Sequence, residues 1–235
     1  MKTKMFDKKA MKAAFLSTIP VLSGYLVLGI GFGVLLKTKG YGVLWAFAMS
    51  LCIYAGSMQY VAIDLLAGGA SLIVAALTTL TVNARHLFYG ISMIDKYKNR
   101  GKVKLYLMFA LTDETYSLVC NDENCVHVEN KTAYYFFVSL FNHIYWVSGS
   151  VIGAILGSNL PFSTEGIDFS LTALFVTVFT QQWLETKKHA PALVGLVVSI
   201  VCLVIWGSKN FLIPAMVFIV IFLSILPDKE GYMNE

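Results

Sequence analysis

The chain has 235 residues, of which 57% are hydrophobic and 14% charged, with a formal net charge of +4 at pH 7 and a mean hydropathy of +0.69. Soluble domains carry about 25% charged and roughly 45–50% apolar residues, so this composition excludes an ordinary soluble fold. The basic residues gather at the ends of apolar runs rather than along one face, which argues against nucleic-acid binding.

Apolar runs near the length that crosses a bilayer, about 20 residues, divide the chain. They are too unbroken to be barrel strands, which alternate over about ten residues. The sequence therefore predicts an all-α polytopic membrane protein, a bundle of about seven or eight transmembrane helices forming one integral membrane domain over residues 1–235. The predicted helices cover 14–36, 42–67, 70–94, 105–120, 133–157, 167–184, 191–207 and 210–226.

The first run, 14–36, follows a basic start and is longer than the roughly 7–15 apolar residues of a secretory signal, so we expect a retained helix. Gly29 and Gly33 lie four residues apart within it, a spacing that predicts close packing against another helix.

Two basic clusters constrain the topology. Basic flanks favour the cytoplasm, but three full crossings would place the two clusters on opposite sides. Either one of the first three runs is broken or re-entrant, or the second cluster is an exception. The first half is rich in glycine and polar residues, which favours a discontinuous helix lining a cavity. The first cluster is Lys2, Lys4, Lys8, Lys9 and Lys12, and the second is Lys96, Lys98, Arg100, Lys102 and Lys104.

A weak internal repeat is also present. The spacing from Gly31 to Gly153 equals that from Gln59 to Gln181, and each glycine precedes an apolar run that contains the glutamine. Secondary transporters are often built of such repeats, so the chain could contain a repeated half.

The third run ends in TVNARHLFYG, where Arg85 and His86 interrupt an otherwise apolar sequence. A charge at the bilayer centre costs about 2.5–3.5 kcal/mol on insertion scales, so such residues usually pair or line a path. Helical spacing places Tyr89 on roughly the same face. The natural partners are Asp113 and Glu114. The alternative is that the helix ends nearby and Arg85 reaches the headgroups.

From these residues we predict a pathway for a substrate and an ion. Arg85 would hold a substrate carboxylate or an internal acid, and His86 with Asp113 or Glu114 would carry a proton. Two amide side chains would orient the polar end of the substrate, although polar side chains in membrane helices also bridge helices. The predicted pathway residues are Gln59, Asn83, Arg85, His86, Tyr89, Asp113 and Glu114.

The sequence predicts no cofactor, no metal site and no enzyme. Cys52 and Cys202 lie in apolar runs, while Cys120, Cys125 and His127 match no common zinc spacing. A hydrolase using Asp113 and Glu114 remains an alternative, but adjacent helical residues point about 100° apart and converge poorly.

The chain resembles the AzlC-like family, the large subunit of bacterial branched-chain amino acid exporters. The order of the NxRHxxY and TDE motifs is the specific part of this resemblance. The matching segments are GYLVLGIGFGVL (24–35), YAGSMQYVAIDLLAGGA (54–70), NARHLFYG (83–90), LTDETYSL (111–118), HIYWVSGSVIGAILG (143–157) and GIDFSLTALFVTVF (166–179).

The resemblance implies an exporter of leucine, isoleucine, valine or their analogues in the bacterial cytoplasmic membrane. It also implies a small AzlD-like membrane subunit as partner. Two other functions stay open: a structural or regulatory membrane subunit that does not itself transport, and an intramembrane hydrolase.

Overall fold

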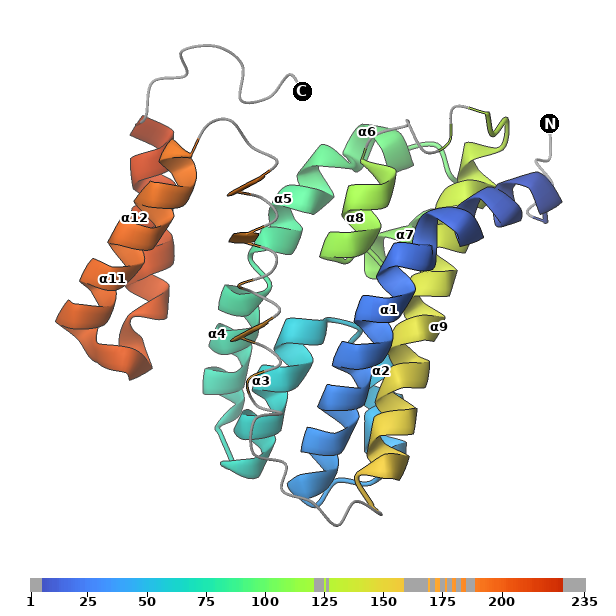
Figure 1. Cartoon of the computed structure of the whole chain (residues 1–235). Coiled ribbons are helices and arrows are strands. Elements are labelled where there is room, and N and C mark those ends of the chain that lie inside the picture. The colour runs from blue at the N-terminus through green and yellow to red at the C-terminus, as the bar shows by residue number, and fades with distance from the viewer. Residues whose placement is uncertain are drawn as a thin grey trace. The chain divides into compact units, whose positions relative to one another are not determined.

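The computed structural model describes residues 6–120, 125, 127–158, 169, 172–173, 176, 179–180, 183–184 and 189–225, and in these it contains helices and no strand. The chain divides into two compact units, Met1–Thr172 and Ala173–Glu235, which are described separately below. Figure 1 shows the helices of both units. The all-helical class predicted from the sequence is confirmed for the described residues.

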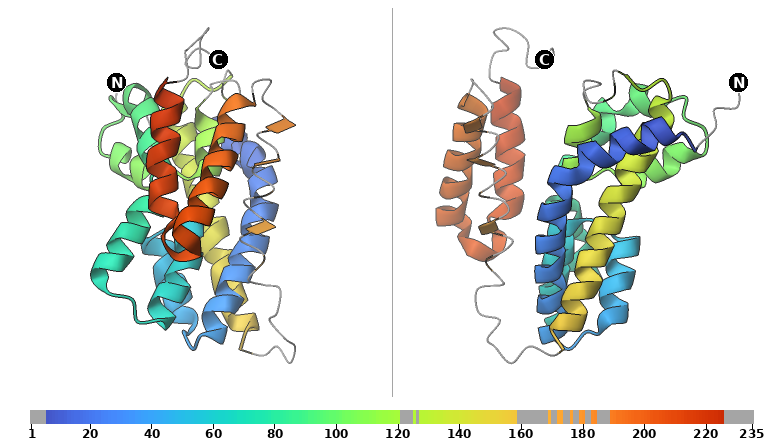
Figure 2. Two further views of the ribbon diagram at one scale, coloured as in Figure 1. Left: turned by 90° about the vertical axis from the view of Figure 1, so that its left-hand side faces the viewer. Right: turned by 45° about the vertical axis from the view of Figure 1, so that its right-hand side comes forward.

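Two long helices, α1 (Lys8–Thr38) and α9 (Lys131–Leu156), form the frame of the first unit. They lie side by side (Figures 1 and 2). Glycines make this close approach possible. A Cβ atom on Gly29 would lie 3.0 Å from the Cα atom of Gly149, and one on Gly33 would overlap the backbone of Ser150. The close packing predicted from Gly29 and Gly33 is therefore confirmed.

The run predicted over 42–67 contains two helices, α2 (Val43–Cys52) and α3 (Gly56–Ala67). Their lengths of 10 and 12 residues give about 15–18 Å each, too short to cross a hydrocarbon core of about 30 Å. Between them Tyr54 adopts a φ of +45°, a left-handed conformation that turns the chain. In Figure 1 α2 starts and α3 ends at the same end of the unit, so the pair is a hairpin.

The run predicted over 70–94 also breaks. Helices α4 (Leu72–Val82) and α5 (Arg85–Ser92) meet at a bend of 50°, and together they are apolar and long enough for one span. The short helix α6 (Ile94–Tyr97) follows.

The interval predicted over 105–120 holds a second, shorter hairpin. Helices α7 (Val103–Phe109) and α8 (Asp113–Val119) have seven residues each. They lie at the opposite end of the unit from the α2–α3 hairpin (Figure 1).

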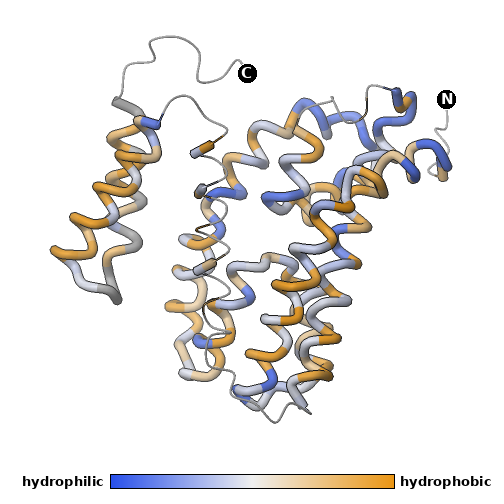
Figure 3. The backbone as a smooth tube through the Cα atoms, in the orientation of Figure 1, coloured by the Kyte–Doolittle hydropathy of each residue, from blue (hydrophilic) through white to orange (hydrophobic). Residues whose placement is uncertain are grey.

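This arrangement resolves the conflict between the two basic clusters. Because α2–α3 returns to the end at which it began, the chain crosses the unit twice between the clusters: once in α1 and once in α4–α5. The described part of the first cluster, at the start of α1, and the second cluster, around α6 and α7, lie at one end of the unit (Figures 1 and 3). Lys2 and Lys4 lie outside the described residues.

The described residues contain three helices long and apolar enough to span a membrane: α1, α9 and Ala190–Gly207; the bent pair α4–α5 would add a fourth. The predicted number of about seven or eight transmembrane helices is thus not confirmed. Most of the predicted helix 167–184 lies outside the described residues, as does Gln181. The repeated half therefore stays a prediction.

The second unit contains a pair of apolar helices, α11 (Ala190–Asn210) and α12 (Leu212–Ile225), which pack against each other. Gly207 has a φ of +71° and kinks the end of α11. Glycine accepts this conformation without steric cost, which allows the tight turn into α12. These helices match the runs predicted over 191–207 and 210–226.

Candidate functional site

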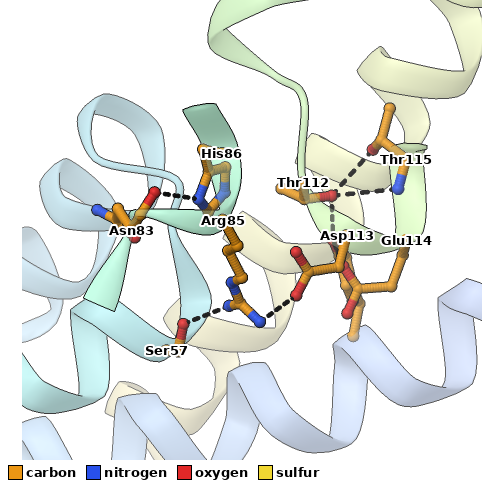
Figure 4. Close-up of polar contacts among 9 residues, drawn as sticks. Ser57, Asn83, Arg85, His86, Thr112, Asp113, Glu114 and Thr115 are labelled. Carbon is orange, nitrogen blue, oxygen red and sulfur yellow. Dashed lines mark hydrogen bonds and ion pairs between the residues drawn. The ribbon is translucent and has the colours of Figure 1, made fainter. Parts of the chain in front are cut away.

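Arg85 is the centre of the polar site. It is the first residue of α5, directly after the bend from α4. Its Nη1 atom lies 2.5 Å from Oδ2 of Asp113, and its Nη2 donates a hydrogen bond of 2.6 Å to Oγ of Ser57 (Figure 4). The ion pair predicted between Arg85 and Asp113 is present. One guanidinium therefore joins the first turn of α3 to the first turn of α8.

The helices of the first unit do not fully bury the ion pair. The side chains of Arg85 and Asp113 are 31% and 23% exposed. Polar side-chain contacts between membrane helices contribute on average only about 0.6 kcal/mol to stability. Exchange of Asp113 for another carboxylate at Arg85 would therefore cost the fold little.

The ends of α3 and α8 have different electrostatic character. Thr112 caps α8 by accepting a 3.3 Å hydrogen bond from the Thr115 amide, and Asp113 and Glu114 in the first turn offset the positive end of its dipole. Helix α3 begins without a side-chain cap and has no acid in its first turn. Its positive end therefore adds to the charge of Arg85, beside Ser57.

Glu114, the other predicted partner of Arg85, points elsewhere. Its Oε2 accepts a 2.6 Å hydrogen bond from the Tyr25 hydroxyl of α1. That hydroxyl also lies 2.7 Å from Oγ1 of Thr112. The network continues from Thr112 to Thr115 at 3.0 Å, and the side-chain amide of Asn142 in α9 donates to Thr115 at 3.1 Å. The two adjacent carboxyl groups thus serve different partners.

Gln59 is fully buried, and both ends of its side-chain amide form hydrogen bonds within the protein. Its Nε2 donates to Oγ of Ser50 at 3.1 Å, and its Oε1 accepts a 2.8 Å hydrogen bond from Nε1 of Trp146. The same indole lies against Gly56, where an added Cβ would be 3.1 Å from the ring. These contacts hold the first turn of α3 against α2 and α9. A direct contact of Gln59 with a solute stays a prediction.

Asn83 and His86 occupy the bend between α4 and α5. The backbone carbonyl of Asn83 lies 3.3 Å from Nδ1 of His86 (Figure 4). Within the part of the chain that the structure describes, His86 forms no ion pair or hydrogen bond with Asp113 or Glu114. The ring of His86 turns back to the carbonyl of Asn83, and the role of His86 with Asp113 or Glu114 in carrying a proton stays a prediction. His86 follows Arg85 directly in the chain and so lies close to the ion pair.

Tyr89 fixes α5 to α8. Its ring stacks on that of Tyr116 with centroids 4.5 Å apart and an interplanar angle of 15°. It also meets the His86 ring edge-on at 5.9 Å. Tyr89 therefore positions the helix that carries Arg85 and His86.

Sequence reasoning missed the hydroxyl groups of the site: Ser57, Tyr25, Thr112 and Thr115. Thr112 was detectable as an N-cap before two acids, a pattern typical of a helix start. Nothing local marks Ser57 as the second partner of Arg85, because the two residues meet only in the folded chain.

Among the described residues, no group of three or more His, Cys, Asp or Glu side chains is arranged to hold a metal ion. The four cysteines, which all lie within the described residues, form no disulfide with one another.

Comparison with known proteins identifies the family. A family model described as AzlC protein matches residues 20–160. The chain is 46% identical over 217 residues to the branched-chain amino acid transport protein AzlC of Bacillus subtilis, covering 92% of this chain and 85% of the relative. It is 42% identical to an uncharacterized membrane protein of Haemophilus influenzae over 94% of this chain and 91% of the relative. It is 34% identical to the inner membrane protein YgaZ of Escherichia coli over 68% of each chain. No solved structure matches the chain.

Proposed function

Because the chain belongs to the AzlC family, we propose that it is a secondary transporter that exports branched-chain amino acids, coupled to protons and assisted by a small AzlD-like membrane subunit. The name of the Bacillus subtilis relative supports the substrate class. The membrane setting is supported by the apolar helices and by the relatives named as membrane proteins.

The observation that carries the proposal is the position of Arg85 between two helical hairpins. The α2–α3 and α7–α8 hairpins come from opposite ends of the unit, and their turning ends meet at this guanidinium. Broken helices at membrane depth are tolerated where they line a cavity, and transporters place their substrate sites at such breaks.

The ion pair suggests how substrate and proton are coupled. A substrate carboxylate and the Asp113 carboxylate compete for the same guanidinium. When the substrate binds Arg85, Asp113 loses its cation and gains affinity for a proton. When the substrate leaves, Arg85 returns to Asp113 and the proton is released. Arg85 then faces one carboxylate in both states, and a bound zwitterionic amino acid adds the charge of its ammonium group to the site.

The orientation of the chain in the membrane follows from the basic clusters. Basic flanks favour the cytoplasm, so the end that carries both basic clusters faces the cytoplasm of the bacterial cell. The α7–α8 hairpin then enters from the cytoplasmic side and α2–α3 from the outside.

The test is efflux of preloaded labelled leucine from cells that lack their own exporters. The chain is expressed alone, with the small subunit, and with the small subunit as Arg85→Lys, with membrane protein quantified each time. Lysine keeps the charge but lacks the planar fork that reaches Ser57 and Asp113 together. We expect efflux only with both wild-type chains, and a loss of rate and of pH dependence in the variant at equal protein level.

Two results would contradict the proposal. Unchanged efflux and pH dependence in Arg85→Lys would remove the competition mechanism. Absence of efflux for leucine, isoleucine and valine despite good expression would remove the substrate class and favour a structural subunit. In that case His86→Ala would lower the amount of folded protein rather than a transport rate.

A further inference from the structure

A pocket of about 220 Å³ lies beside the candidate site, lined by residues of α5, α6 and α7 and by the turn before α8. Its walls are mostly apolar: Met93, Ile94, Met108, Phe109 and Leu111. An engineered apolar cavity of about 150 Å³ takes up benzene, so this volume suits a solute of a few more heavy atoms.

Two hydrogen-bond donors line this pocket without a partner in the described part of the chain. The hydroxyl of Tyr97 is buried, with the residue 1% exposed, and makes no hydrogen bond. Lys104 is half-buried and forms no ion pair with any described residue. A buried donor left without an acceptor costs about 1–3 kcal/mol, and more when it is charged. The buried Tyr97 hydroxyl therefore calls for an acceptor, and the half-buried Lys104 ammonium that lines the same pocket favours one that is anionic.

The pocket also adjoins the ion pair. His86 lines the pocket and follows Arg85 in the chain, while Leu111 lines it and precedes Thr112. Tyr97 is the last residue of α6 and Lys104 lies in the first turn of α7, and both helices belong to the basic end of the unit. The pocket thus connects the residues of the basic end with those beside Arg85.

We propose that this pocket is the cytoplasmic entry site for the transported amino acid, with the carboxylate on Lys104 and the Tyr97 hydroxyl and the branched side chain against the apolar walls. This inference rests on the proposed function and deepens it, because it identifies where the substrate is selected before it reaches Arg85. It also assigns a role to Lys104 and Tyr97, which the ion-pair mechanism does not use.

The chemistry supports an amino acid rather than a larger amphiphile. The donors can satisfy one carboxylate, and the volume leaves room for a short branched chain. His86 can act as an acceptor for the ammonium group, since the carbonyl of Asn83 requires a proton on Nδ1 and leaves Nε2 without one in the neutral ring.

Gly90 provides a way to fill the pocket without disturbing the helix. It lines the pocket, and an added Cβ would meet no atom within 4 Å. Gly24 in α1 is a matched control, because its added Cβ also meets nothing within 4 Å and it does not line the pocket. Exposed Lys102, two residues before Lys104, is the control for charge.

The experiment measures binding of labelled leucine to the full chain with its small subunit in lipid nanodiscs, with unlabelled leucinol and alanine as competitors. Leucinol lacks the carboxylate. We expect wild-type protein to prefer leucine over leucinol by about tenfold or more, as loss of a charge-assisted hydrogen bond predicts. Lys104→Met should abolish most of this preference, and Tyr97→Phe should reduce it by about fivefold.

Gly90→Leu should lower the preference for leucine over alanine by about tenfold, since the larger substrate loses its space. Gly24→Leu and Lys102→Met should leave both preferences unchanged. The inference is wrong if Lys104→Met and Gly90→Leu bind leucine, leucinol and alanine like the wild type. It is also wrong if these variants change only the phospholipid that co-purifies, which would assign the pocket to a lipid.

Failure of the proposed function gives a different result. Wild-type protein would then bind leucine in nanodiscs but not move it in the efflux assay, while the pocket variants would still report on binding. Absence of any leucine binding by the wild type would overturn both. Normal efflux with unchanged preferences in the variants would overturn the pocket alone.

Discussion

The α1–α9 pair and the two short hairpins illustrate two ways of building a membrane protein. In the pair, continuous helices satisfy their own backbone groups, and glycines bring the two backbones into contact. In the hairpins, the helices stop within the unit and their ends need partners from elsewhere. Arg85, Thr112 and Gln59 provide these partners or hold them in place. The difference is reflected in the site: the carboxylates Asp113 and Glu114 lie in a hairpin, while the pair contributes neutral hydrogen-bonding groups such as Tyr25 and Asn142.

The largest expected effect is seen when the proposed topology is tested by labelling cysteines from one side of the membrane, because each position either reacts or does not. In a background with the native cysteines replaced by serine, Lys98→Cys should react with an impermeant maleimide only from the cytoplasmic side. Lys39→Cys, at the other end of α1, should react only from outside. The control is labelling after the membrane is permeabilised. Labelling of both positions from the same side would contradict the single crossing in α4–α5 that the proposed topology places between Lys39 and Lys98.

The next effect tests the rigid frame. Gly33→Leu should strongly reduce the amount of folded protein, since even a Cβ there overlaps the backbone of Ser150 and the helices must separate. The measurement is the monodisperse fraction after detergent extraction, followed by fluorescence-detected chromatography. Gly24→Leu, in open space on the same helix, is the matched control. Equal folded yields for the two variants would contradict the close contact of α1 with α9.

At the hairpin site, in contrast to the α1–α9 pair, we expect a substitution to reduce transport more than stability. Asp113→Asn removes the carboxylate of the ion pair, and polar contacts between membrane helices are individually weak, so the expected loss of unfolding free energy is only about 1 kcal/mol. Transport per molecule should fall by about 10–100-fold, because a charged hydrogen-bond partner of Arg85 is lost. Efflux and thermal stability are measured on the same preparations. A variant that loses stability as much as activity would show that the pair supports the fold.

The smallest effect on transport is expected at Gln59, which supports the first turn of α3. Gln59→Leu leaves the Trp146 indole and the Ser50 hydroxyl without their partner, at a cost of about 1–3 kcal/mol. The melting temperature should fall, and the efflux rate should fall only as far as the first turn of α3 shifts. Ser57→Ala is the comparison, since it removes only the second partner of Arg85. A stable Gln59→Leu protein with no transport would instead place Gln59 in contact with the solute.

Much of the candidate site was predictable from residue types. An arginine within an apolar run needs a counter-charge. Asp113 and Glu114 are adjacent acids within another apolar stretch of the sequence. Residue type could not decide which of the two acids forms the ion pair with Arg85. Asp113 meets Arg85 and Glu114 meets Tyr25 because neighbouring residues of α8 point in different directions.

The membrane character of the chain follows from amino-acid order alone, because apolar composition sets the transfer free energy of each run wherever it lies. The same composition does not distinguish one helix over 42–67 from a hairpin of α2 and α3. That choice depends on contacts between distant residues: Tyr54 turns the chain against His143, with ring centroids 4.1 Å apart, and Trp146 seats the first turn of α3. Only the folded chain brings these groups together, so only tertiary structure decides where the helices break and which side chains meet at the break.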